Sequence, residues 1–500
     1  MTRLTRLGVA RALAVGAGAA TLALASAGPV VAHDKDHPQH VAQHQATIAV
    51  VPPLMSNNME LVGSVPNATG ISGDYAISTK HFYLSTLEGI TVLDISKPEQ
   101  PVVKGKYVNS YFENEAMNYG ERRADRKVTD QFVLIGVDLQ SVDPLDPVHT
   151  NIGGGALIVV DVTNPNNPHA RSRVKATTST HTVSCVREIQ CRYAYTAGSK
   201  GKFSIIDLTN LDNPKEVDSD PTTPDVIDPF DSPAAAPGAV FTRGAGHKWN
   251  FDRGAIGFHT GSAGTAAFDV SKPADPKLLT TTGAAGRGEA GFEEYNNFIH
   301  HNSWHPHHNK FRADAPAALS NGNVLLITEE DYEQTDCSLA GSFQTWKIDG
   351  FDRPDGIKPL DKVELADLGG PTDFVPPVGT FCSAHWFDYH QSGIAAVGYY
   401  GGGVRLVDVR DPKDIKPYGY AVGGETWDAY WLPQRRANGT AELPRTNILY
   451  QVDLLTGLTV YRVNLPAGNA GQRATTAGAT QTSLPTLMNH SCGTQMAGAL

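Results

Sequence analysis

The sequence predicts an all-β protein, a seven-bladed β-propeller, and three observations lead to this fold class. A β-branched apolar run that ends in Asp and a proline-containing turn, as in residues 153–168, occurs seven times in exact or degenerate form. The copies are spaced by about 61 residues on average, more than the roughly 40–50 residues of common propeller repeats. Each run is too short for a globular helix and rich in Val and Ile, which indicates a strand. A repeat of several short strands is typical of a propeller blade, and insertions between strands would supply the additional length.

The repeated aspartate marks the third strand of each predicted blade. Five copies retain it, and two keep the apolar frame with Lys or Arg in its place. Because the same residue stands at the same point in five blades, we expect a structural role, in which its side chain accepts backbone N–H bonds in the turn before the proline. In chain order these positions are Asp94, Asp161, Asp207, Asp269, Lys347, Asp408 and Arg462.

The N-terminal strand is predicted to complete the last blade. Each blade should run from an inner strand through a Tyr/Phe-rich strand and the aspartate strand to an outer strand. Residues 59–65 resemble the outer-strand segments, whereas the last copy, residues 458–463, has no such segment after it. Pairing these two strands removes an exposed sheet edge and closes the ring. The predicted propeller spans residues 59–466, and an Ala/Thr/Gly-rich flexible tail follows at 467–500.

Residues 1–32 have the features of a secretory signal peptide. Three arginines precede and open an apolar Ala/Leu/Val/Gly run that ends in small residues. Cleavage is expected after Ala32 or, at the rival site, after Ala27; the alternative is an uncleaved membrane anchor. Cleavage would leave a secreted, extracellular chain without a membrane span. Residues 33–58 follow as a His-rich linker that can chelate divalent metals, although we favour a solvated, flexible segment.

The net charge and the cysteine content indicate which partners and which compartment suit the chain. The net charge is −11, and removal of the leader arginines makes the chain more acidic still, which does not suit nucleic acid or an anionic membrane. Export permits disulfides. Cys185 and Cys191 flank a predicted hairpin turn, and Cys337 and Cys382 are candidates for a bond between a loop and the next blade. Cys492 is left over in the tail, and the sequence alone does not determine the connectivity.

A histidine or a carboxylate stands where the inner strand begins in most blades. Inner strands line a propeller channel, so residues at one height on successive inner strands converge on one axial site. Imidazole nitrogens and carboxylate oxygens there can bind Fe, Cu, Mn or Zn. The alternative is a hydrated polar channel in which each histidine meets water or backbone. The candidate ligands are His181, His247, His301 and His385, with Glu115 and Glu425 as further ligands or as partners that fix the imidazole tautomers.

The fifth blade carries two further features. The residue of its inner strand that faces the channel is ambiguous, because Asn302 fits the spacing slightly better than His301. A secondary acidic cluster, Glu329, Glu330 and Asp331, ends its second strand and could bind Ca²⁺ or act in acid–base chemistry, although we favour a solvated loop. Three histidines in a nearby proline-containing loop are expected to face solvent. They are His305, His307 and His308.

The repeated Val-Asp-Val-x-x-Pro pattern resembles the LVIVD-repeat family of secreted β-propeller proteins over roughly residues 59–465. The histidine before the second strand and the stretch from His301 to Asp331 are similar to the choice-of-anchor-type LVIVD proteins. The resemblance implies a propeller and export, and it implies little about activity. Carotenoid oxygenases, which hold iron with four axial histidines, and methanethiol-oxidase-like selenium-binding proteins are more distantly similar. Their flanking motifs have no match in this chain, so neither activity is carried over.

Two functions remain open from the sequence. The first is a secreted binding or scaffolding propeller with an axial His-cluster metal site, whose partner is a small molecule or a cell-surface molecule. The second is a metal-dependent oxidoreductase that uses the histidine ring in the channel. A buried cluster that opens into a partly apolar pocket would favour the second function.

No nucleophile elbow, Walker loop, dinucleotide fingerprint or zincin helix occurs in the sequence.

Overall fold

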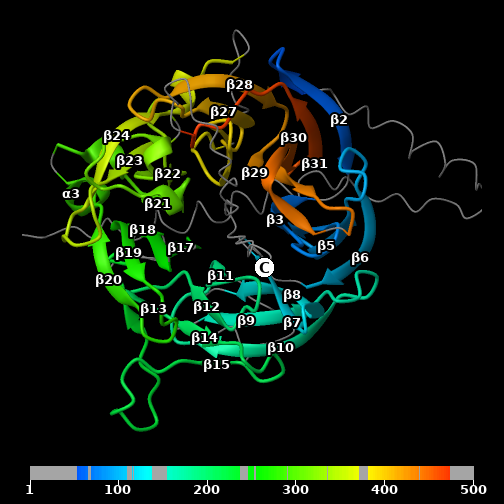
Figure 1. Cartoon of the computed structure of the whole chain (residues 1–500), viewed down its shortest axis with the longest axis vertical. Coiled ribbons are helices and arrows are strands. Elements are labelled where there is room, and N and C mark those ends of the chain that lie inside the picture. The colour runs from blue at the N-terminus through cyan, green and yellow to red at the C-terminus, as the bar shows by residue number, and fades with distance from the viewer. Residues whose placement is uncertain are drawn as a thin grey trace, which may run out of the picture. The chain divides into compact units, whose positions relative to one another are not determined.

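The computed structural model confirms the seven-bladed propeller. It describes residues 53–65, 69–109, 115, 117–137, 155–236, 246–252, 255–289, 291–334, 336–370, 381–438 and 440–472. Among these residues, seven antiparallel sheets of four strands stand in a ring (Figure 1), and one of them gains a short fifth strand. Across each sheet the strands follow the predicted spatial order, from the inner strand at the channel to the outer strand.

Blades 1 to 4 occupy the first half of the chain. Blade 1 consists of β3 (Gly70–Tyr75), β4 (His81–Thr86), β5 (Gly89–Asp94) and β6 (Val102–Val108). Blade 2 consists of β7 (Asn118–Ala124), β8 (Lys127–Val137), β9 (Gly155–Asp161) and β10 (His169–Ala176). Blade 3 consists of β11 (Val183–Cys185), β12 (Tyr193–Thr196), β14 (Ile205–Asp207) and β15 (Lys215–Glu216). Blade 4 consists of β17 (Gly246–Phe251), β18 (Ile256–Gly261), β19 (Gly264–Asp269) and β20 (Lys277–Thr281).

Blades 5 to 7 follow the same order. Blade 5 consists of β21 (Ile299–Trp304), β22 (Val324–Glu330), β23 (Phe343–Ile348) and β24 (Ile357–Val363). Blade 6 consists of β25 (Phe387–His390), β26 (Ile394–Gly398), β27 (Val404–Asp408) and β28 (Lys416–Val422). Blade 7 consists of β29 (Thr426–Arg435), β30 (Ala441–Asp453), β31 (Gly457–Val463) and the N-terminal strand β2 (Met59–Val65).

Short elements connect or extend the blades. β13 (Lys202–Phe203) pairs with β16 (Phe230–Asp231) beside blade 3. A short helix, α3 (Gly283–Gly286), and four 3₁₀ turns lie between strands of blades 4 to 6. The turns are Glu293–Tyr295, His308–Lys310, Leu319–Asn321 and Leu365–Leu368. No helix among the described residues is long and apolar enough to cross a membrane.

The hydrophobic core lies between the blades. The described residues form seven apolar clusters, and each cluster joins two neighbouring blades. Strand β8 illustrates the cause, because successive side chains of a strand point to opposite faces. Phe132 and Leu134 pack against blade 3, whereas Val133 and Ile135 pack against blade 1. Burial of each such side chain stabilises the fold by roughly 1.5–3 kcal/mol, so each blade is stable only with its neighbours in place.

Buried polar side chains also connect neighbouring inner strands. Asp74 Oδ2 accepts the Tyr119 N–H at 2.8 Å, which joins blade 1 to blade 2. Asp388 Oδ2 accepts the Trp431 N–H at 2.9 Å and joins blade 6 to blade 7 in the same way. Bonds of this kind satisfy backbone donors that would otherwise be buried without a partner, and they set the inner strands at defined heights around the channel.

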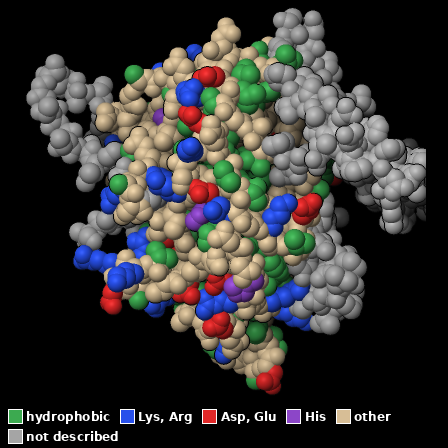
Figure 2. Space-filling model, turned by 90° about the vertical axis from the view of Figure 1, so that its right-hand side faces the viewer, with side chains coloured by type: hydrophobic (Ala, Val, Ile, Leu, Met, Phe, Trp, Pro, Cys, Tyr) green, Lys and Arg blue, Asp and Glu red, His purple; other side chains and the backbone are tan. Residues whose placement is uncertain are grey.

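The ring is closed by β2, as predicted. Met59 pairs with Val463 and Val65 with Leu458 in antiparallel register. A Cβ at Gly63 would lie 2.0 Å from the Glu99 carbonyl oxygen of blade 1, so only glycine fits where the closing strand passes its neighbour. On the outer surface, Arg462 forms ion pairs with Glu60 and Glu99 at 2.5 and 2.6 Å. Figure 2 shows that basic, acidic and hydrophobic side chains are mixed on this side of the molecule.

The first described strand lies before the predicted boundary at residue 59. β1 (Leu54–Met55) pairs with β28 as a fifth strand of blade 6, although the sequence places it in the linker. Asn58 Nδ2 also donates to the Tyr418 carbonyl oxygen at 2.9 Å. Two residues after a pair of prolines do not indicate a strand in the sequence, and the strand forms here because β28 offers a free sheet edge.

Candidate metal centre

Five of the six predicted ligands converge at one end of the channel. Glu115 precedes β7, His181 precedes β11, and His385 precedes β25, whereas His247 and His301 lie at the starts of β17 and β21. They therefore come from five consecutive blades. Glu115, His247, His301 and His385 are buried, and His181 is partly exposed.

β-Bulges direct two of these histidines into the cluster. In blade 4, Gly246 pairs with Gly261 and Lys248 pairs with Thr260, so His247 is an extra residue in the strand. In blade 5 the extra residue is His301, which stands between the paired residues His300 and Asn302. A bulge re-aims the side chain of the extra residue. It explains why the regular spacing slightly favoured Asn302, which instead accepts a hydrogen bond from Asn250 at 2.8 Å.

Glu115 lies at the centre of the cluster. Its Oε2 is 3.0 Å from His181 Nε2. Its Oε1 is 3.1 Å from His385 Nε2, 3.3 Å from His301 Nε2 and 4.0 Å from His247 Nε2. The four imidazoles thus direct the same type of nitrogen toward one carboxylate.

Two imidazoles are oriented by backbone carbonyl groups. His247 Nδ1 donates to the His301 carbonyl oxygen at 3.1 Å, and His385 Nδ1 donates to the Trp427 carbonyl oxygen at 2.8 Å. A carbonyl oxygen can only accept, so the proton of each neutral ring is on Nδ1. The Nε2 atom of each ring therefore faces the cluster, as a metal ligand of this orientation requires.

Glu330 joins the cluster in place of Glu425. The Glu330 carboxylate lies 3.7 Å from His301 Nε2 and 3.8 Å from His385 Nε2. With His247 and His301 it forms one of three groups whose ligand atoms all lie within 4.8 Å of one another. The other two groups both contain Glu115, one with His181 and His247 and one with His301 and His385.

The predicted ligand Glu425 lies outside these groups. In blade 7 the bulge residue is Trp427, since Thr426 pairs with Asp453 and Asp428 pairs with Val452. The Trp427 ring, 5.1 Å from the His385 ring, thus takes the position that histidines occupy in blades 4 and 5. The Glu425 carboxylate accepts a hydrogen bond from Trp427 Nε1 at 3.3 Å and forms no ion pair with the histidines among the described residues.

Two aromatic residues that the sequence analysis did not single out complete the surroundings. Trp386 Nε1 donates to Glu115 Oε1 at 2.9 Å, and the Trp386 ring lies 4.4 Å from the His301 ring. The Tyr400 hydroxyl donates to Glu330 Oε1, and its ring lies 4.6 Å from the His385 ring. Tyr400 has a φ of 44°, in the left-handed region that non-glycine residues rarely adopt. The Trp next to His385 was visible in the sequence, but no spacing rule connects Tyr400 to the cluster.

Burial and mutual charge set the protonation of the cluster. Burial raises the pKa of Glu115, but the neighbouring His181 and His385 outweigh it and hold the pKa well below its ordinary value. Burial and the other imidazoles keep the pKa of His247 well below its usual range and lower that of His301 to about 3. Burial also lowers the pKa of His385, but Glu115 outweighs it and the net shift is upward. His247 and His301 are therefore neutral, which is the state that binds metal.

The secondary acidic cluster does not form one site. Glu330 points to the histidines, whereas Glu329 accepts from the Asn297 N–H at 2.6 Å and from Ser342 Oγ at 2.9 Å. Asp331 accepts from Asn297 Nδ2 at 2.9 Å and from the Glu333 N–H at 3.0 Å. All three carboxylates are buried, so the expected solvated loop is wrong. The cause is that β22 extends to Glu330, and side chains alternate across this strand.

The three loop histidines are also buried, which corrects the expectation that they face solvent. His305 contacts Asp252 at 3.1 Å and the Gly322 carbonyl oxygen at 2.8 Å, and His307 contacts the Tyr389 hydroxyl at 3.2 Å. His308 is 8% exposed. The loop folds back onto blades 5 and 6, and the hydrogen bonds of the rings offset the cost of burying them.

Some of the remaining predictions are confirmed, and others concern residues outside the described part of the chain. Disulfides join Cys185 to Cys191 and Cys337 to Cys382, as proposed. The turn aspartates accept backbone N–H bonds two residues ahead, for example Asp94 from Ser96 and Asp269 from Ser271, both at 2.8 Å. The leader, the linker histidines and Cys492 lie outside the described residues.

Fold and site define a β-propeller whose channel holds a buried cluster of histidines and carboxylates. Residues 69–109 and 189–223 match the model of the LVIVD repeat. The chain is thus an LVIVD-repeat β-propeller. No curated protein matches the sequence significantly.

Three solved structures are similar to the chain at low identity. The β-propeller domain of Cps50 (Swd1) from Myceliophteria thermophila is 10% identical, with a TM-score of 0.46, 83% of this chain covered and 100% of that one. A putative 6-phosphogluconolactonase from Bacteroides fragilis is 12% identical, with a TM-score of 0.41 and coverages of 84% and 98%. The WD40 β-propeller domain of Doa1 is 8% identical, with a TM-score of 0.44 and coverages of 81% and 96%.

Proposed function

We propose that this chain is an exported binding propeller that holds a divalent transition-metal ion in its channel. The Nε2 atoms of the four histidines and the Glu115 carboxylate would be the ligands, with Glu330 beside them. Export is supported by the two disulfides, because such bonds persist mainly in oxidising compartments. The ligands are His181, His247, His301, His385 and Glu115.

The single observation that carries the proposal is the orientation of His247 and His385. Each donates its Nδ1 proton to a backbone carbonyl oxygen and so directs its Nε2 toward Glu115. Four Nε2 atoms directed at one carboxylate form a compact donor set of the kind that binds a transition-metal ion. A backbone acceptor behind the ring is the usual way in which proteins orient a metal-ligating histidine.

The donor set favours a particular class of metal. Imidazole nitrogens suit Zn, Cu, Fe and Mn, whereas Ca²⁺ and Mg²⁺ take oxygen ligands. When bound, such an ion supplies Lewis acidity and, for Cu, Fe or Mn, access to a second oxidation state. The chain itself would contribute Trp386, which orients Glu115 by its indole N–H, and a buried aromatic wall that restricts water.

A metal-dependent oxidoreductase is the second candidate, and Tyr400 favours it. Its hydroxyl donates to Glu330, whose pKa is raised to about 7 by burial despite the opposing effect of His385. This pair can hold a proton at the edge of the cluster, as the oxidation of a substrate with proton release would require. The left-handed backbone of Tyr400 is a strain that proteins retain mostly where a side chain has a function.

Metal analysis of the full chain purified from the exported fraction tests the proposal. The wild type should contain about one equivalent of transition metal, and His247→Ala should lose most of it while circular dichroism shows an intact fold. His169→Ala removes an exposed histidine of the outer strand β10 and should leave the metal content unchanged. Metal-free wild type that cannot be loaded, or equal metal in His247→Ala, would contradict the proposal. A protein that holds only Zn would exclude the redox candidate alone.

A further inference from the structure

A pocket lies on blades 2 and 3, toward the other end of strand β7 from the histidine cluster. Strand β7 begins beside Glu115 and ends at Arg122 and Arg123, which line this pocket. Its volume is about 420 Å³, within the usual range for a small-molecule site. Two further arginines, Arg171 of β10 and Arg192, also line the pocket, together with Asp130 and uncharged residues.

Two of the four arginines are neutralised within the protein. Arg171 forms ion pairs with Asp130 at 2.7 Å and Asp212 at 2.6 Å. Arg123 pairs with Glu121 at 2.5 Å. Their charges are thus used to hold the walls of the pocket together.

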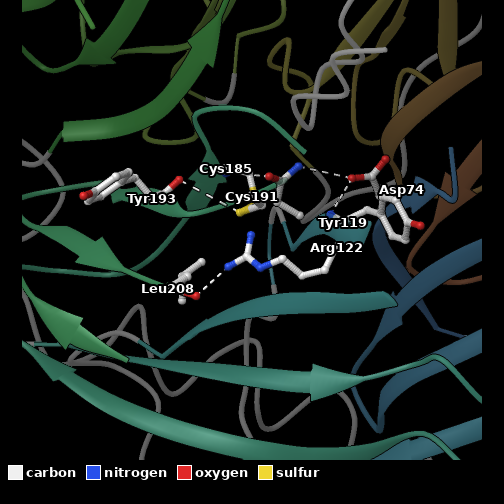
Figure 3. The surroundings of a disulfide bond; sticks show 8 residues. Asp74, Tyr119, Arg122, Cys185, Cys191, Tyr193 and Leu208 are labelled. Carbon is white, nitrogen blue, oxygen red and sulfur yellow. Dashed lines mark hydrogen bonds between the residues drawn. A yellow bond between two sulfur atoms is a disulfide. The ribbon is translucent and has the colours of Figure 1, made fainter. Parts of the chain in front are cut away.

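The other two, Arg122 and Arg192, form no ion pair among the described residues. Arg122 Nη2 donates to the Leu208 carbonyl oxygen at 2.5 Å, and its buried Nη1 has no hydrogen-bond partner in this part of the chain. Figure 3 shows this bond beside the disulfide. The backbone of Arg192 is held at the same place, because its carbonyl oxygen accepts the Leu208 N–H at 2.7 Å. Burial and the charge of Arg192, opposed by Asp130 and Asp207, lower the pKa of Arg122 to about 10.

Backbone contacts and a disulfide hold the hairpin that carries Arg192 against strand β7. The disulfide between Cys185 and Cys191 closes the hairpin that precedes Arg192. The tip of the hairpin is bonded to β7, with the Gln190 N–H donating to the Glu121 carbonyl oxygen at 2.9 Å and Gln190 Nε2 to the Arg123 carbonyl oxygen at 2.7 Å. Gln190 has a left-handed φ of 63°. A site whose groups are fixed before binding loses little conformational entropy when a ligand arrives.

We propose that this pocket binds a tetrahedral oxyanion, phosphate or sulfate, between Arg122 and Arg192, as the free ion or as the ester group of a small polar molecule. Guanidinium groups match the geometry of such oxyanions and donate charge-assisted hydrogen bonds to them. A bound anion would balance the charges of two arginines that have no ion-pair partner in the described part of the chain. The volume leaves room for a polar group the size of a sugar beside the anion.

Isothermal titration calorimetry of the full chain at low ionic strength tests this site, because screening by salt weakens such contacts. The probes are inorganic phosphate, inorganic sulfate, glucose 6-phosphate and glucose 6-sulfate. Arg192→Ala removes an exposed side chain and should weaken binding roughly tenfold or more, as expected for a lost charge-assisted contact. Arg122→Gln should do the same, and its melting temperature shows whether the fold is retained.

Arg187→Ala is the matched control, because Arg187 is exposed on the same hairpin and does not line the pocket. It should bind like the wild type. Unchanged affinity in His247→Ala excludes the histidine cluster as the source of the heat. No binding of any probe by the wild type, unchanged binding by Arg192→Ala, or an equal loss in Arg187→Ala would each overturn the proposal. Tighter binding of a sugar ester than of its free anion identifies the ester, and equal binding identifies the ion.

Discussion

The residues at the two ends of the strands differ in how much they vary from blade to blade. At the turn end, the third strand finishes in an aspartate in five blades, and each of these carboxylates accepts a backbone N–H bond within its own turn. At the channel end, the residue where the inner strand begins changes from blade to blade. It is Ile71, Glu115, His181, His247, His301, His385 and Trp427.

The contrast teaches how to separate structure from function in a repeat protein. A residue that recurs at the same position in most units serves a need that those units share, in this case a turn that leads to the outer strand. A position where the units differ, while their backbones remain equivalent, serves what only the assembled ring can do. The turn carboxylates bond locally, whereas Glu115 contacts side chains from four other blades.

The largest effect is expected from a buried inner-strand carboxylate. Burial raises the pKa of Asp74 from 3.8 to about 7, although the N–H groups of Tyr119 and Tyr75 oppose the shift. Between pH 4 and pH 7 the folded protein therefore keeps a proton that the unfolded chain releases, so this group's contribution to stability falls as the pH rises and is constant above about 7. The total change is roughly 4 kcal/mol.

Asp74→Asn removes this dependence. The variant should be less stable than wild type at pH 4, because an amide nitrogen would face the Tyr119 N–H. The difference in unfolding free energy should then shrink by up to roughly 4 kcal/mol as the pH rises to 7. Urea denaturation of both proteins at several pH values measures it. Parallel stability profiles would show that Asp74 does not titrate in this range.

The next effect distinguishes the two ends directly. Glu115→Gln should weaken metal binding at least about a hundredfold. Loss of a residue that only orients a metal ligand already weakens metal binding by about 10–100-fold, and Glu115 would be a ligand itself. Asp269→Asn changes a carboxylate to an amide at the turn end and should leave metal affinity unaltered. Competition with a chromogenic chelator measures both affinities. Equal losses in the two variants would remove the distinction between the ends.

The smallest effect is expected at the turn end. Asp269→Ala loses the 2.8 Å hydrogen bond from the Ser271 N–H, whose donor then meets water. The unfolding free energy should fall by about 1 kcal/mol, with the metal content unchanged. Thermal and urea denaturation provide the measurement, and a loss well above this value would mean that the turn aspartate has contacts beyond its own turn.

Much of the fold followed from local patterns. The strand-and-turn repeat predicted the number of blades, and the missing outer strand of the last copy predicted the closure of the ring by residues 59–65. The disulfide between Cys185 and Cys191 followed from a hairpin that is itself a local feature. Each of these predictions concerns strands that are neighbours within one blade or one hairpin.

The parts of the site that escaped prediction depend on backbone irregularity and on contacts between distant segments. Spacing in a regular strand could not choose between His301 and Asn302, because the bulge that selects His301 shifts the register by one residue. The same irregularity in β29 brings Trp427 rather than Glu425 to the cluster. Glu330 and Tyr400 reach it from the ends of second strands, and no periodicity in the sequence links those ends to the starts of inner strands.

The closing strand has a consequence for biosynthesis. β2 lies at the start of the propeller and its partner β31 at the end, so blade 7 cannot form until the chain has been made through β31. Pairing of segments so distant in sequence is slow, and unpaired strand edges expose a growing chain to aggregation. A copy that is cut short before β31 has no partner for β2 and retains an open edge. The ring therefore closes only in a polypeptide that extends through β31.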